Sequence, residues 1–190
     1  MINYLLQTKR IHFDRLTIEN VPIMLTAFNS PELENLVLID APLWGKFENT
    51  LIYEKKDLED LLEKWSKTSK IQAYGIIKKE SDELIGHFFY DYEWDTHFVF
   101  VLFVIYPEHQ KKGYGKEIGP FILNLIFKNT VANNITIKFD EDNVIGMKFA
   151  EKLGFKSSGI LRRAGYKGGK IRSLHTHDIL RREWRNENAN

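Results

Sequence analysis

The clearest chemical signal in the sequence is one short segment, residues 110–116, which reads QKKGYGK. Apolar residues recur at helical spacing after it, which predicts a helix beginning near Gly115. The first turn of a helix leaves backbone N–H groups without intrahelical partners, and the helix dipole adds partial positive charge there. Because glycines let the backbone approach a phosphate closely, the segment predicts an anion-binding site.

The spacing of the two glycines differs from that of the common nucleotide-binding motifs. A P-loop needs a glycine followed by Lys-Ser or Lys-Thr, and neither Gly113 nor Gly115 is followed in that way. The Rossmann motif needs a third glycine where this chain has Ile118. The pattern that remains is Q-x-x-G-x-G. Its alternative interpretation is a strand-to-helix turn in which the glycines serve geometry alone.

The segment is positioned by a strand before it and a helix after it. Residues 98–106 are all apolar, rich in β-branched and aromatic types, and are followed by Pro107. They predict a strand buried on both faces, and the run is too short to cross a bilayer. The helix is predicted over residues 116–127.

Length and composition favour a single domain spanning residues 1–190. Lysine plus arginine number 27 and aspartate plus glutamate 26, so the net charge of +1 gives no general field to attract nucleic acid or an anionic membrane. The absence of cysteine excludes disulfides, thiolate metal sites and a cysteine nucleophile. The first residues lack the pattern of a signal peptide. We therefore expect a cytoplasmic protein with no metal and no nucleic-acid or membrane partner.

The remaining elements are predicted from hydrophobic periodicity and turn residues. The predicted helices are 18–28, a short turn within 32–38, 56–67 and 144–153, and the predicted strands are 10–16, 71–79, 84–92, 135–139, 156–166 and 171–182. Residues 39–53 form an irregular aromatic segment that either closes over a ligand or is a loop pinned to the core. The tail 186–190 is expected to be frayed. This order indicates a mixed α/β layout.

A second motif follows at residues 143–155, NVIGMKFAEKLGF. The two motifs together resemble those of the GNAT acetyltransferase superfamily, in the same order. The run PEHQ at 107–110, GILR at 159–162 and DILRREW at 178–184 resemble the branch that holds ribosomal-protein alanine N-acetyltransferases and spermidine acetyltransferase. The resemblance covers most of the chain and is strongest over residues 101–155.

The resemblance implies the GNAT fold of the α/β (α+β) class. Its mixed central sheet has about six to seven strands, splayed between the fourth and the fifth, and about four flanking helices. It also implies acetyl-CoA as a cosubstrate whose pantetheine arm lies in the splay. By analogy, the arm bonds to the backbone of Phe103, Val104 and Ile105.

The family's pyrophosphate loop maps onto the glycine segment. The residues implied are Gln110, Lys111, Lys112, Gly113, Tyr114, Gly115 and Lys116. The lysines add charge-assisted contacts, or else are solvated surface residues. Asn143 either reaches the pantetheine arm or caps its helix, and both roles are compatible.

Acetyl transfer from a thioester needs no acyl-enzyme. The amine must be uncharged and held about 3 Å from the carbonyl carbon, and the developing oxyanion needs a donor. The resemblance implies the backbone N–H of Val104 as that donor. The missing cysteine is therefore no obstacle to this reaction.

Several catalytic positions of the family hold unsuitable residues here. The usual tyrosine acid is replaced by Ala150, an alternative serine by Gly146, a central-strand carboxylate by Phe100 and a late aspartate by Ser173. No acid or base is thus transferred by position. The candidates for a base are Glu93, Asp95 and His97, then His87, His175 and His177. Each of them is also compatible with a surface or core role, and a water chain could replace a base.

The replacements bear on the acceptor substrate. A site lined by Tyr92, Trp94, Phe98 and Phe100 would be aromatic rather than acidic, which disfavours a polyamine, although an aromatic cage can hold a cation. A basic cluster could face an acidic substrate or the ribose 3′-phosphate of the cosubstrate, or be an exposed hairpin. Its members are Arg162, Arg163, Lys167, Lys170 and Arg172.

The sequence therefore predicts an N-acetyltransferase that moves the acetyl group of acetyl-CoA to a primary amine of a small molecule or a protein N-terminus. A homodimer stays open. The alternative is a catalytically degenerate module that binds acyl-CoA as a sensor or structural partner. It is favoured by Ala150, Gly146 and Phe100.

Overall fold

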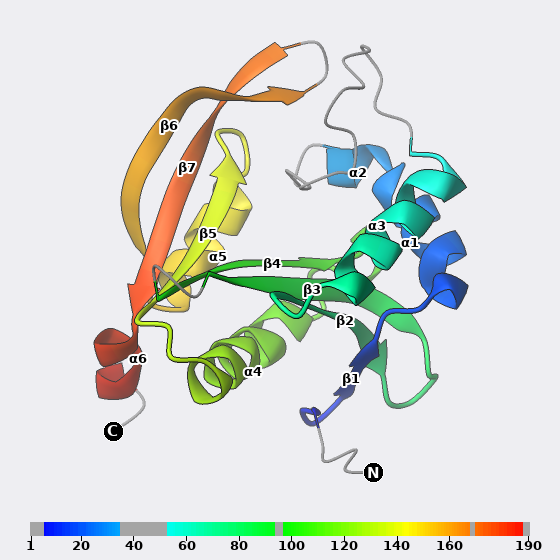
Figure 1. Cartoon of the computed structure of the whole chain (residues 1–190), viewed down its shortest axis with the longest axis horizontal. Helices are drawn as coiled ribbons and strands as arrows, with labels where there is room; N and C mark the ends of the chain where they lie inside the picture. Colours follow the sequence, from blue (N-terminus) through cyan, green and yellow to red (C-terminus); the bar gives the residue numbers. More distant parts are fainter. Residues whose placement is uncertain (1–5, 35–52, 94–96, 168–169, 188–190) are drawn as a thin grey trace.

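The computed structural model describes residues 6–34, 53–93, 97–167 and 170–187 (Figure 1). Its sheet has seven strands in the order β1-β2-β3-β4-β5-β7-β6. The strands are β1 (Ile11–Arg15), β2 (Ile71–Lys78), β3 (Leu84–Glu93), β4 (Phe98–Ile105), β5 (Asn134–Asp140), β6 (Lys156–Lys167) and β7 (Lys170–Leu180). All neighbours are antiparallel except β4 and β5, which are parallel.

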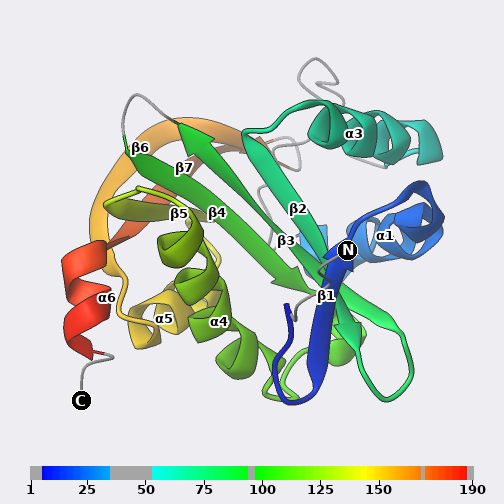
Figure 2. The ribbon, with the colours of Figure 1, turned by 60° about the horizontal axis from the view of Figure 1, so that its bottom comes forward.

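The helices cover both faces of this sheet. They are α1 (Val21–Phe28), α2 (Pro31–Glu34), α3 (Lys55–Lys67), α4 (Tyr114–Asn129), α5 (Val144–Lys152) and α6 (Arg181–Glu187), with short 3-10 turns at Ile18–Asn20 and Pro107–His109. Figures 1 and 2 place α1 and α3 on one face and α4 with α5 on the other. None of the helices in these ranges is long and apolar enough to span a membrane.

Strand β4 separates two hydrophobic cores because its side chains alternate between the faces. Val99 and Val101 lie in the core beneath α4, together with Ile118 and Ile122 of that helix. Leu102 and Val104 belong to the other core, with α1 and α3, and the partly buried Phe100 packs against it. The prediction of a strand covered on both faces is confirmed, although Phe98, Phe100, Phe103 and Ile105 are only partly buried.

The parallel pair β4–β5 is short. Its pairing runs from Phe98 opposite Asn134 to Phe100 opposite Thr136. Beyond Phe100 the structure records no further pairing between these strands, and β5 continues along β7 as far as Asp140. The predicted splay between the fourth and fifth strands is confirmed, and with it the predicted fold class.

The C-terminal segment differs from its prediction. The last strand ends at Leu180 rather than at residue 182, and α6 follows. Glu183 Oε2 accepts a hydrogen bond from Leu180 N–H, which closes the first turn of α6. The guanidinium of Arg181 donates to the carbonyls of Phe127, Thr130 and Ala132 and so anchors the turn beneath α4. Residues 186–187, which the sequence assigned to the tail, belong to α6.

Candidate active site

The splay exposes one edge of β4. Tyr106 N–H donates to Ile85 O at 2.8 Å, so the pair Tyr106/Ile85 is a hydrogen-bonded pair of the β3–β4 ladder. Hydrogen-bonded pairs alternate with non-bonded ones along an antiparallel ladder. Phe103 and Ile105 consequently direct their backbone groups away from β3, toward the space where β5 has diverged.

The same alternation corrects the prediction for Val104. Val104 lies opposite His87 in the ladder, two residues from Tyr106, and so its N–H points toward β3. This amide is engaged inside the sheet and does not face the splay. The N–H of Phe103 is the suitably directed neighbour.

The glycine loop is joined to the end of β4 by Gln110. Its Nε2 donates to the carbonyl oxygen of Ile105 at 2.9 Å. That bond crosses the 3-10 turn Pro107–His109 and fixes the loop at the mouth of the splay. The structure thus shows Gln110 bonded to the backbone of β4, a contact within the protein, whereas the sequence predicted it as a cosubstrate-binding residue.

Gly113 is the N-cap of α4 and has φ +81° and ψ 3°, a left-handed conformation that favours glycine. A Cβ built on it meets only Arg10 Nη2, at 3.6 Å, so the side on which a side chain would lie is open. Lys111 is also left-handed, at φ +59°. The backbone around the start of α4 is therefore shaped for the approach of an anion.

A clamp that the motif did not reveal holds this loop. Arg10 Nε donates to Glu117 Oε2 at 2.6 Å, and Arg10 Nη1 donates to Lys112 O at 3.1 Å. The Arg10 guanidinium also lies 4.4 Å from the ring centroid of Tyr114. Burial would raise the pKa of the Glu117 carboxyl, but hydrogen bonds from Thr8 and Arg10 outweigh it and lower the pKa. The charged carboxylate fixes Arg10 against the loop.

Phe149 of α5 stands between the loop and the splay. Its ring centroid is 5.7 Å from that of Phe103 in an edge-to-face arrangement. A Cβ built on Gly115 would lie 3.4 Å from Phe149 Cζ. The second glycine of the motif is therefore explained by close packing of α5 against α4.

Asn143 adopts the capping role that the sequence allowed. Its Oδ1 accepts from Gly146 N–H at 2.8 Å at the start of α5, and the residue is buried. Gly146 packs tightly on this cap, because a Cβ there would lie 2.7 Å from Asn143 Oδ1. Ala150 is 2% exposed in the core beneath α5. The positions of the family's tyrosine acid and of its alternative serine are thus occupied by Ala150, which packs in the core, and by Gly146, which packs against the Asn143 cap.

The predicted basic cluster divides into two groups. Arg162, Arg163 and Lys170 are exposed on the β6–β7 hairpin, as are Lys111, Lys112 and Lys116 on the glycine loop. Arg172 instead pairs with Asp140 at 2.9 Å, with Glu141 at 3.4 Å and with Asp142. Hydrogen bonding to Asp140 raises the pKa of Arg172. Its charge is neutralised by these carboxylates, so an anionic substrate has no free cation at this position.

The histidines differ strongly in environment. His87 is buried, its Nδ1 lies 3.2 Å from Tyr106 Oη, and desolvation lowers its pKa to about 3. His177 is buried against Phe139, with ring centroids 5.5 Å apart, and desolvation lowers its pKa as well. His175 is half-buried on β7 beside Phe139. His87 and His177 are core residues.

The candidate bases that precede β4 lie at the N-terminal end of this strand, away from the splay at its C-terminal end. His97 is exposed with φ +53°, and its carbonyl accepts from Asn133 N–H at 2.7 Å. Six residues separate it from Phe103, which is about 20 Å along a strand. Glu93 pairs with Phe98 at the same end. Asp95 lies outside the described residues.

The aromatic residues do not form the predicted common lining. Tyr92 lies in the core beneath α4, whereas Phe100 packs with the core of α1 and α3, on the opposite face. Trp94 lies outside the described residues. Phe100 contacts Phe89, with ring centroids 6.1 Å apart, and it also has charged neighbours: Asp91 lies directly opposite it on β3, and Lys138 Nζ of β5 lies 5.5 Å from its ring centroid. A carboxylate within an otherwise largely apolar and aromatic strand was the available signal for Asp91.

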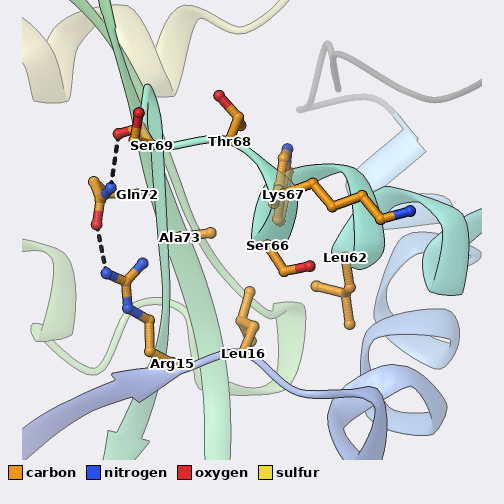
Figure 3. Close-up of a pocket in the computed structure, with 10 residues that line it drawn as sticks. Arg15, Leu16, Leu62, Ser66, Lys67, Thr68, Ser69, Gln72 and Ala73 are labelled. Atoms are coloured by element: carbon orange, nitrogen blue, oxygen red, sulfur yellow. Dashed lines mark hydrogen bonds between the residues drawn. The ribbon is translucent and has the colours of Figure 1, made fainter.

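A cavity of about 490 Å³ lies elsewhere, where α3 passes into β2. Figure 3 shows Leu62 pointing toward it from α3, Leu16 from the segment after β1 and Ala73 from β2, with Arg15 bonded to Gln72 at the strand. It does not adjoin the splay. Among the residues that the structure describes, no group of three or more acidic or histidine side chains is arranged to hold a metal ion.

Comparison with known proteins agrees with this geometry. The model of the acetyltransferase (GNAT) domain family matches residues 41–173, which is more than half of the chain. The chain therefore belongs to the GNAT acetyltransferase family. A curated relative, the uncharacterized N-acetyltransferase YnaD of Bacillus subtilis, is 26% identical over 134 residues, covering 70% of this chain and 78% of the relative.

Solved structures share the fold at low sequence identity. Spermidine N-acetyltransferase from Vibrio cholerae, in complex with CoA and spermine, superposes with a TM-score of 0.77 at 18% identity, covering 92% of this chain and 98% of that one. RimL, a ribosomal L7/L12 alpha-N-protein acetyltransferase in complex with coenzyme A, superposes with a TM-score of 0.75 at 12% identity, covering 91% of this chain and 95% of that one. The protein is thus an acetyl-CoA-dependent acyltransferase with the fold of both branches that its sequence resembles.

Proposed function

We propose that the protein transfers the acetyl group of acetyl-CoA to a primary amine of a small molecule or of a protein N-terminus. The observation that carries this proposal is the separation of β4 from β5 beyond Phe100, with the glycine loop fixed at its mouth. An extended thioester arm fits an edge whose backbone groups have no strand partner. A phosphate fits the start of α4.

The cosubstrate is proposed to bind through groups that face this space. The backbone of Phe103 and the N–H of Ile105 bond the pantetheine arm, and the amides from Lys111 to Lys116 bond the pyrophosphate, with Gly113 leaving room for it. Lys111, Lys112 and Lys116 are exposed and add charge to the same end of α4. Asn143 caps α5 on the other side of the splay.

The acceptor amine is proposed to arrive from the opposite face of the sheet. Helix α4 covers the face that carries Val99 and Val101, whereas Phe100, on the opposite face beside the splay, is only partly buried, so we assign the second substrate to the face of Phe100. Asp91 and Lys138 lie on that face. The acceptor therefore meets charged groups as well as the Phe100 ring.

These residues provide the elements of a direct transfer. The amine nitrogen forms a bond to the acetyl carbonyl carbon, the carbon–sulfur bond breaks, and the electron pair leaves on sulfur as a thiolate. The N–H of Phe103 stabilises the oxyanion that develops on the carbonyl oxygen. Asp91 accepts the proton that the amine loses, directly or through a water molecule.

The test is release of free coenzyme A from acetyl-CoA with a panel of amines and peptide N-termini. Turnover with at least one acceptor, reduced at least tenfold in Asp91→Asn while coenzyme A affinity is retained, supports the proposal. Tight binding of acetyl-CoA with no thiol released by any acceptor would contradict it. That result would favour the acyl-CoA-binding module, to which the buried Ala150 in place of a tyrosine acid also points.

A further inference from the structure

Lys138 places a cation beside the splay, on the face where the acceptor arrives. It follows Thr136, the last β5 residue paired with β4, by two positions and therefore shares its face. Its ammonium lies 5.5 Å from the ring centroid of Phe100, within cation–π range, and the residue is exposed. The Phe100 ring fixes where this charge lies.

The carboxylates nearest in register are engaged by other groups. Asp140, two residues along β5, pairs with Arg172 at 2.9 Å. Asp178, on the neighbouring strand, accepts from Asn134 Nδ2 at 3.1 Å. No carboxylate in the described ranges lies within ion-pair distance of Lys138 Nζ. In the described part of the chain, the ammonium is thus held over an aromatic ring without a carboxylate counter-ion.

We propose that Lys138 binds a carboxylate of the acceptor, so that the preferred acceptors are amines that also carry a carboxylate. This inference rests on the proposed acetyl transfer. Asp91 and Lys138 flank Phe100 from the strands on either side of β4. An amino carboxylate lying across the ring directs its amine toward Asp91 and its carboxylate toward Lys138. A polyamine gains nothing from Lys138, because like charges repel.

The experiment compares matched acceptors that differ in one charge. Coenzyme A release is measured with 4-aminobutyrate and 4-aminobutyramide, with phenylalanine and phenylalaninamide, and with peptides whose second residue is Asp or Asn. The pairs distinguish a free amino carboxylate from a peptide carboxylate. We expect kcat/KM to be at least tenfold higher for the carboxylate member of the best pair.

The variants are Lys138→Gln and Lys138→Arg. Lys138→Gln is expected to lose the preference for the carboxylate while its rate with the neutral member stays within about twofold, and Lys138→Arg is expected to retain the preference. Thermal midpoint and coenzyme A affinity, measured by calorimetry, show that each variant is folded and binds its cosubstrate.

Two outcomes would overturn the inference, and only one of them would also overturn the proposed acetyl transfer. If amines are acetylated but the carboxylate and neutral members react equally, or Lys138→Gln slows both alike, the inference fails and the proposed transfer stands. If coenzyme A binds and no acceptor releases thiol, the proposed transfer and this inference fail together.

Discussion

Arg10 and Glu117, separated by more than half of the chain, form an ion pair of 2.6 Å between Nε and Oε2. The pair joins the segment before β1 to the first turn of α4. Because Arg10 also donates to Lys112 O and lies over the ring of Tyr114, it contacts the glycine loop at two points and the first turn of α4 at Glu117. The start of the chain therefore contributes to the shape of the proposed pyrophosphate site.

Glu117→Gln is expected to weaken both the loop and the site. The neutral amide presents one acceptor oxygen where the carboxylate accepts from Thr8 Oγ1, Arg10 N–H and Arg10 Nε. Since Arg10 is nearly half exposed, the loss in unfolding free energy is about 1–2 kcal/mol rather than the full value of a buried charged pair. The Kd for coenzyme A, measured by calorimetry, is expected to rise about three- to tenfold.

The matched control is Glu63→Gln, which breaks the ion pair of Glu63 with Lys67 on the surface of α3. It removes the same charge without touching the loop. We expect little change in stability and an unchanged Kd. Equal effects of the two substitutions on coenzyme A binding would show that Arg10 and Glu117 do not shape the site.

Gly113→Val is expected to raise the Kd for coenzyme A at least tenfold while the fold survives. The position has φ +81°, and a non-glycine residue in the left-handed region costs about 1–2 kcal/mol. The space beside its Cα holds only Arg10 Nη2, 3.6 Å from a built Cβ, so the branched side chain enters the proposed phosphate site rather than the core. Calorimetry and thermal unfolding separate these two effects.

Gly159→Val controls for the strain alone. Gly159 has φ +153° on β6, at a register irregularity of the β6–β7 hairpin, and a Cβ there meets nothing within 4 Å. Gly159→Val is expected to lower the stability of the fold, while its new side chain lies away from α4. If Gly113→Val bound coenzyme A as tightly as Gly159→Val does, the first glycine would serve the turn only.

The sequence was most informative where pattern and geometry are local. The apolar run, the Pro107 stop and the two glycines defined a strand, a turn and a helix, and β4 and α4 lie within two residues of their predicted bounds. The resemblance to the family, which rests on the glycine loop and the motif that begins at Asn143, also predicted the separation of β4 from β5. These features depend on neighbours in the chain, which hydrophobic periodicity and turn chemistry describe.

What the sequence missed depends on register and on distant contacts. Whether an amide of β4 faces the splay is decided by the ladder with β3, and a shift of one residue separates Val104 from Phe103. The clamp of Arg10 on Glu117 and the placing of Lys138 over Phe100 join segments far apart in the chain. No local pattern marks such partners.

Gly146→Ser, which introduces the alternative serine of the family's motif, is expected to destabilise the protein by about 1–2 kcal/mol. The new Cβ would lie 2.7 Å from Asn143 Oδ1 and displaces the cap from Gly146 N–H. Asn143→Ala removes the same cap for about 1 kcal/mol. In that background Gly146→Ser meets no side chain there, and it is expected to stabilise α5 by up to about 0.5 kcal/mol, because serine is a better helix former than glycine.

The reversal of sign is the informative result of this double-mutant cycle, measured by urea unfolding. Additive losses would mean that Asn143 and Gly146 do not interact, contrary to the geometry. The cycle also tests why the family serine is absent, since a serine tolerated in the native background would remove the packing explanation for Gly146.

His87 is expected to make the free energy of unfolding decrease as the pH falls below neutrality. Its pKa is lowered to about 3 by desolvation, against about 6.5 in the unfolded chain. The unfolded state therefore binds the proton more readily between these values, and stability falls as pH falls through that range. From pH 7 to pH 5 the loss from this single group is about 2 kcal/mol.

The double variant His87→Phe/Tyr106→Phe tests this assignment without leaving a lone buried hydroxyl, because the imidazole and Tyr106 Oη are each other's partners at 3.2 Å. Its unfolding free energy, measured in urea at pH 7, 6 and 5, is expected to fall by about 2 kcal/mol less than that of the native chain over the same interval. Tyr106→Phe alone keeps the imidazole buried and should retain the native pH dependence. Parallel pH profiles for the native chain and the double variant would mean that His87 is not held neutral in the core, and that the core beneath α1 and α3 admits water.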